Sequence, residues 1–75
     1  MNKQRRTEIA SIVIELENIK SRLESVLSDE QDVFDNMPEN LQGSMRGEES
    51  QEAIDYMEEA VSSIEEAVSQ LEEIQ

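Results

Sequence analysis

The feature that most constrains the fold of this chain is a seven-residue repeat that occurs three times in succession over residues 52–72, as EAIDYME, EAVSSIE and EAVSQLE. Each repeat places two large apolar residues alternately three and four positions apart, which are the a and d positions of a heptad on one helix face. Alanine fills the g position before each a, and so wide a stripe is typical of a helix in a bundle. The repeats predict a helix over residues 48–74.

A second heptad stripe runs through the N-terminal half and predicts a helix over residues 4–34, with Asn2 or Thr7 as its N-cap. Its a and d positions hold Ile9, Ile12, Leu16, Ile19, Leu23, Val26, Val33 and Met37, and Val13, Leu27 and Phe34 widen it at e. Glu30 interrupts the stripe at an a position. We consider three roles for Glu30: a buried charge that makes the pairing of helices specific, a side chain that extends to solvent, or a partner of Arg46.

The connection, residues 35–47, contains the sole proline and both glycines. Pro38 can start a short helical turn, and Gly43 suits the left-handed residue that often ends one. We expect Leu41 and Met45 to fold back over this end of the molecule. The connection is long for so small a domain, and such loops tend to be functional.

These elements predict one all-α domain spanning residues 1–75, a two-helix antiparallel hairpin. A single hairpin cannot bury two wide stripes, and a chain of this length often completes its core by association. We therefore expect the hairpin to form a homodimer, an antiparallel four-helix bundle.

The net charge of −13 is unevenly distributed. Residues 1–46 contain six basic and nine acidic residues, whereas residues 47–75 contain ten acidic residues and no basic one. Such a surface repels nucleic acid and anionic membranes and favours basic partners. No apolar run approaches the length of a membrane span and no secretory signal is recognisable, so we expect a cytoplasmic protein.

The residue inventory excludes most catalytic chemistry. The chain contains no histidine and no cysteine, which removes Ser-His-Asp and Cys-His centres and the usual zinc ligands. Its paired glutamates fall at e and f positions facing water, where no cleft could set two carboxyl groups to different tasks. We expect a protein that is not an enzyme and has no cofactor or metal.

The same glutamates suggest a binding surface. A negative ribbon about 30 Å long could imitate a phosphate backbone and occupy the basic groove of a nucleic-acid-binding protein. Its members are Glu52, Glu58, Glu59, Glu65, Glu66 and Glu73. The alternative interpretation is a solvated face that keeps a small bundle soluble.

The connection offers a second candidate site. Its polar residues include Asn36, Glu39, Asn40, Ser44 and Arg46. They could form a small-ligand site in a protein that sequesters a nucleotide signal, with Arg46 as the anion contact, or simply a capped turn between two helices. A structural bundle with no dedicated ligand is a third interpretation of the whole chain.

Over FDNMPENLQGSMRGEE and AIDYMEEAVSSIEEA, and across nearly its full length, the sequence resembles short acidic uncharacterised helical-hairpin proteins of phages and prophages of Firmicutes. The resemblance implies an accessory protein that binds and inhibits a host defence or transcription component. It assigns no functional residue.

Overall fold

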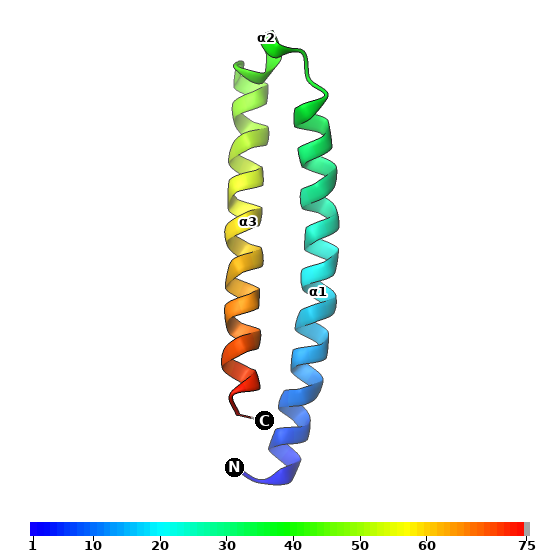
Figure 1. Cartoon of the computed structure of the whole chain (residues 1–75), viewed down its shortest axis with the longest axis vertical. Helices are drawn as coiled ribbons and strands as arrows, with labels where there is room; N and C mark the ends of the chain where they lie inside the picture. The colour runs from blue at the N-terminus through cyan, green and yellow to red at the C-terminus, as the bar shows by residue number, and fades with distance from the viewer. Residues whose placement is uncertain (75) are drawn as a thin grey trace.

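The computed structural model describes residues 1–74, and these form three helices, α1 (Lys3–Asp35), α2 (Glu39–Gln42) and α3 (Met45–Glu72). α1 and α3 lie side by side and run in opposite directions, and α2 joins them at one end (Figure 1). The radius of gyration of the 75-residue chain, 17.1 Å, exceeds the roughly 11 Å of a compact chain of that length. The predicted all-α class is confirmed, in the form of a rod measuring 58 × 15 × 12 Å.

Side-chain caps determine where the two long helices begin. Asn2 caps α1, because its Oδ1 accepts a hydrogen bond from the Arg5 backbone N at 2.8 Å. Ser44 caps α3 in the same way, accepting from the Gly47 backbone N at 3.4 Å. α3 therefore begins at Met45, three residues before the predicted start.

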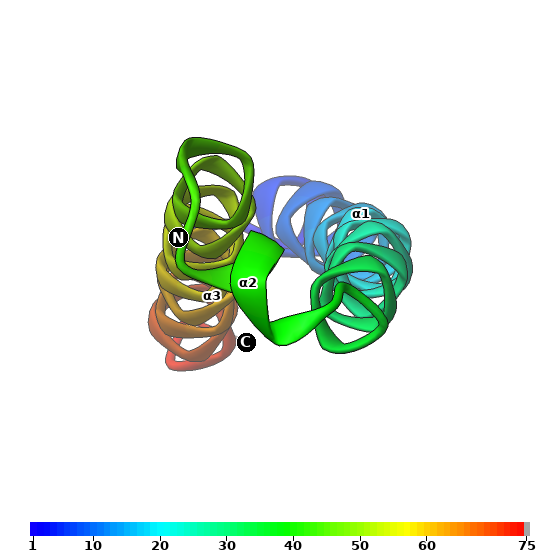
Figure 2. The same ribbon diagram turned by 90° about the horizontal axis from the view of Figure 1, so that it is seen from above.

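α2 crosses the space between the ends of α1 and α3 when the molecule is viewed along its length (Figure 2). Gln42, its last residue, donates from Nε2 to the backbone oxygens of Phe34 at 3.1 Å and Met37 at 3.3 Å. The last carbonyl groups of a helix have no partner within it. Gln42 therefore supplies a cap for the end of α1 from outside that helix.

Two expectations for this connection were wrong. Gly43 has φ −87° rather than a left-handed conformation, because a backbone bond from Ser44 N to Leu41 O at 3.1 Å closes the turn without one. Leu41 and Met45 are 39% and 77% exposed and do not cover the end of the rod. Gly47 makes the close contact there instead, since a Cβ at Gly47 would lie only 2.1 Å from the Gln42 carbonyl oxygen.

The core between α1 and α3 is thin. Within residues 1–74 the buried apolar side chains are Val13, Ile54, Val61 and Val68, at 4 to 8% exposure. On α3 these are the predicted a positions, and the d residues Met57, Ile64 and Leu71 are half-buried beside them. The seam of α3 was therefore located correctly from the sequence.

On α1 the seam is displaced by one position from the prediction. The a residues Leu16 and Leu23 and the e residues Leu27 and Phe34 are half-buried, with Val13 buried among them. The d residues, expected in the core, are exposed: Ile12, Ile19, Val26 and Val33. One neighbouring helix can cover only two adjacent rows of a three-row stripe, and the a and e rows are the ones covered.

Two polar contacts cross this seam. Ser50, 5% exposed, donates from Oγ to Glu30 Oε1 at 2.9 Å. Lys20 Nζ, on α1, lies 4.0 Å from Glu65 Oε1 on α3 and 3.6 Å from Glu17 Oε2. Glu30 thus has Ser50 as its partner, and the expected pairing with Arg46 was wrong because Arg46 is exposed on the first turn of α3.

Candidate partner-binding surface

The candidate glutamates of α3 are all exposed, but they belong to two separate rows. The f positions, which we call the outer row, lie on the side of α3 opposite its seam with α1. They are Glu52, Glu59, Glu66 and Glu73. Glu58 and Glu65, at e positions, form a groove row beside α1. The heptad pattern already assigns the two rows to different positions, f and e, and the structure shows that the e row is the one beside α1.

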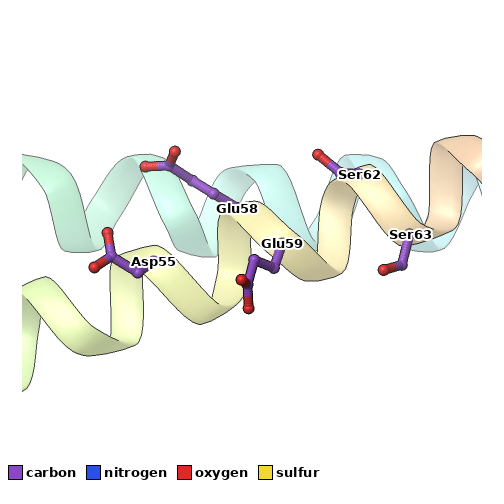
Figure 3. A pocket seen from close by; sticks show the side chains of 5 residues that line it. All are labelled: Asp55, Glu58, Glu59, Ser62 and Ser63. Atoms are coloured by element: carbon purple, nitrogen blue, oxygen red, sulfur yellow. The ribbon is translucent and has the colours of Figure 1, made fainter.

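The structure shows this divergence at the middle of α3. Glu58 and Glu59 are adjacent in sequence, and their side chains extend from the helix in different directions (Figure 3). Asp55, Ser62 and Ser63 complete the lining of a shallow open depression there. Because serine side chains are short, the carboxylates stand above the surface and are accessible to a partner's cations.

The groove row is partly neutralised, whereas the outer row is not. Glu65 forms an ion pair with Lys20. Both of the ion pairs found within residues 1–74 involve this one lysine. Exposed pairs of this kind contribute roughly 0 to 1 kcal/mol, so their effect here is on local charge more than on stability. No member of the outer row takes part in these two ion pairs.

The carboxylates do not converge on a point. Among residues 1–74 no group of three or more acidic side chains is close enough to hold a metal ion. What α3 offers is ten carboxylates over 28 helical residues and the two that follow, about one per 4.5 Å at the helical rise and spread over several sides of the helix. Phosphates along one DNA strand are about 3.4 Å apart, a density that the summed charge of α3 approaches and that the outer row alone, with one carboxylate per about 10.5 Å, does not.

The polar residues of the connection lie on three different elements. Asn36 ends α1, Glu39 and Asn40 belong to α2, and Ser44 and Arg46 belong to the cap and first turn of α3. Ser44 is occupied as a cap and also donates to the Leu41 backbone oxygen. Gln42 holds the connection together through its hydrogen bonds to the backbone oxygens of Phe34 and Met37. The sequence did not predict this capping role, because Gln42 lies eight residues after Phe34 and outside the helical periodicity.

The helices of residues 1–74 include none that combines the length and the apolar character needed to span a membrane. Comparison of the chain with protein-family models, with curated proteins and with solved structures finds no match.

Proposed function

We propose that this protein is a non-enzymatic helical hairpin that acts as a dimer and binds a basic protein through the outer row of α3. The observation that carries the proposal is the outer row itself: four glutamates at seven-residue intervals, all exposed and none of them a member of the two Lys20 ion pairs. An uncompensated line of charge speeds encounter with a surface of opposite sign and selects against acidic partners.

The partner class follows from the sign of the charge and its linear arrangement. A groove that binds nucleic acid presents lysine and arginine side chains to a row of phosphates. The outer row presents four exposed carboxylates in one line, about 10.5 Å apart at the helical rise, for such side chains to contact. We therefore propose that the partner is a nucleic-acid-binding host protein of defence or transcription, inhibited by occupation of its groove in the host cytoplasm, and that this chain is phage-encoded.

The loop alternative has less support. A nucleotide site needs convergent donors for phosphate, and Arg46 is the only cation of the connection, residues 35–47. Gln42 and Ser44 use their side chains to cap helix ends.

The test is capture from a Firmicutes lysate on immobilised protein, with elution by a DNA duplex. We expect nucleic-acid-binding proteins to be retained and to be released by the duplex. The triple variant Glu52→Lys, Glu59→Lys, Glu66→Lys should retain none of them. Retention that is indifferent both to the duplex and to the triple variant would refute the proposal.

A matched control separates the outer row from net charge. Glu8→Lys, Glu24→Lys, Asp35→Lys changes the charge by the same amount on α1, where all three residues are exposed. This control should retain the partner. If it loses the partner as completely as the α3 variant, the outer row has no special role.

A further inference from the structure

One side of the rod carries an apolar face that residues 1–74 leave largely uncovered. On α1 it consists of Ile12, Ile19, Val26 and Val33, each seven residues from the next and 38, 47, 56 and 53% exposed. On α3 it consists of the alanine row Ala53, Ala60 and Ala67, of which Ala60 is exposed and the other two are half-buried. We call these seven residues the apolar face.

The exposed d row of α1 and the alanine row of α3 lie on the same side of the rod. This follows from the other side of the seam, where residues at b positions of α1 lie beside residues at e positions of α3. One depression joins Gln31 of α1 to Gln51 and Glu58 of α3. Another joins Glu17 of α1 to Glu65 and Glu72 of α3. The α1 residues are at b and the α3 residues at e. The d row of α1 and the g row of α3 each lie about 150° around the helix from those positions, so both border the opposite side of the seam.

The chain exposes more surface than a compact monomer of its mass. A folded monomer of 8.6 kDa typically exposes about 4,700 Å², whereas this chain exposes 5692 Å². The excess, about 1,000 Å², is close to the roughly 800 Å² that each partner buries in a standard stable interface. A second copy seated on the apolar face would bring the exposed area per chain into the normal range.

Shape and charge favour another copy of this chain as the occupant. The face has one bulky row and one small row, and in an isologous pair the bulky row of each copy can lie on the small row of the other. The α3 border of the face is uncharged over Tyr56, Ser63 and Gln70, so it can accept the charged α1 border of a partner, which contains Glu15, Arg22 and Asp29. The opposite side, with Glu17, Glu58 and Glu72, would repel a second copy.

We propose that two copies pair through the apolar face about a two-fold axis parallel to the helices, placing each α1 row on the other copy's alanine row. This axis keeps every residue at its own height along the rod. Lys20 is level with Glu65, so Val26, six residues further along α1, is level with residues near 59. Val26 of each copy therefore meets Ala60 of the other, and the outer rows remain exposed on opposite sides of the dimer.

The chain contains no cysteine, which allows a direct test of this pairing. Equal amounts of Val26→Cys and Ala60→Cys protein, mixed and oxidised, should give a disulfide-linked heterodimer. Each variant oxidised alone should give far less. A disulfide requires Cα atoms within about 7 Å, so failure of the mixed pair to link in a dimeric sample would overturn the assigned axis.

A matched pair of substitutions tests the face without a crosslink. Ile19→Glu alters the apolar face, whereas Ile14→Glu makes the same change at a residue that is 63% exposed elsewhere on α1. Because the dimer is symmetric, Ile19→Glu buries one carboxylate in each copy. The substitution should therefore weaken dimerisation about 100-fold or more, as measured by sedimentation equilibrium. Ile14→Glu should leave it unchanged. Equal effects of the two substitutions, or a monomeric unmodified chain at 100 μM or so, would overturn the proposal.

These outcomes are independent of the acidic surface. A monomer that still binds a basic partner through the outer row would refute the pairing and leave the proposed partner-binding role standing.

Discussion

Ser50 on α3 donates a hydrogen bond of 2.9 Å to the Glu30 carboxylate on α1, and this pair replaces an apolar contact in the seam. Ser50 is 5% exposed and Glu30 is half-buried. Ser50→Ala should lower the free energy of unfolding by about 1 to 2 kcal/mol, because it leaves a partly buried carboxylate without its donor. Denaturation followed by circular dichroism at one protein concentration would measure this. Ser62→Ala, on the exposed side of α3, should change the same quantity by less than about 0.5 kcal/mol.

The Ser50–Glu30 pair need not stabilise the fold more than two apolar side chains at the same positions would. Glu30→Leu together with Ser50→Ala continues the leucine series of Leu16 and Leu23 and should be at least as stable as the unmodified protein. A double variant less stable than Ser50→Ala alone would show that the seam cannot accept a leucine at this position.

The two glycines of the connection should respond oppositely to alanine. Gly47→Ala forces a Cβ to within 2.1 Å of the Gln42 carbonyl oxygen, and a backbone atom cannot move aside cheaply. We expect a loss of about 1 to 3 kcal/mol in the free energy of unfolding. Gly43→Ala meets nothing within 4 Å, so it should be neutral or stabilising by up to about 1 kcal/mol. Equal effects would mean that α2 does not pack on α3 as described.

Gln42 should be required as a donor rather than as a space-filling side chain. Gln42→Glu keeps the shape but removes the amide that contacts the Phe34 and Met37 backbone oxygens, and it places a negative charge at the C-terminal end of α1. A loss of about 1 to 2 kcal/mol is expected. Urea denaturation of this variant should show an unchanged slope and a lower midpoint, whereas an unchanged midpoint would remove Gln42 from the capping role.

Ala60→Leu tests the close approach expected at the apolar face. Ala60 is exposed in the single chain, so a leucine there should leave the helical content intact. In a dimer the larger side chain should overpack the contact with Val26 of the other copy, at a cost of about 1 to 3 kcal/mol in dimer stability. Sedimentation of the variant across a dilution series would measure that cost, and an unweakened dimer would place Ala60 outside the interface.

The heptad pattern of the sequence predicts the helical class, the two long helices and the seam of α3. It could not rank the three apolar rows of α1, because Ile12, Leu16 and Val13 are equally hydrophobic and only the position of α3 decides which rows are covered. The partners of Glu30 and Gln42 depend on contacts 20 and 8 residues away in sequence, beyond any local pattern. The exposed glutamates were identified correctly as exposed, and their e and f positions separate the two rows in the sequence itself. The ion pair between Glu65 and Lys20 of α1 required the structure.

The measurement that bears most directly on the outer row is the affinity of a captured partner as a function of salt. For the unmodified protein, log Kd should rise steeply as salt increases through roughly 0.05 to 0.2 M, because ions are displaced from both charged surfaces. The Glu52→Lys, Glu59→Lys, Glu66→Lys variant should bind at least about 100-fold more weakly with a flatter slope, while the α1 control keeps the original slope. An affinity and slope that survive the triple reversal would contradict the account.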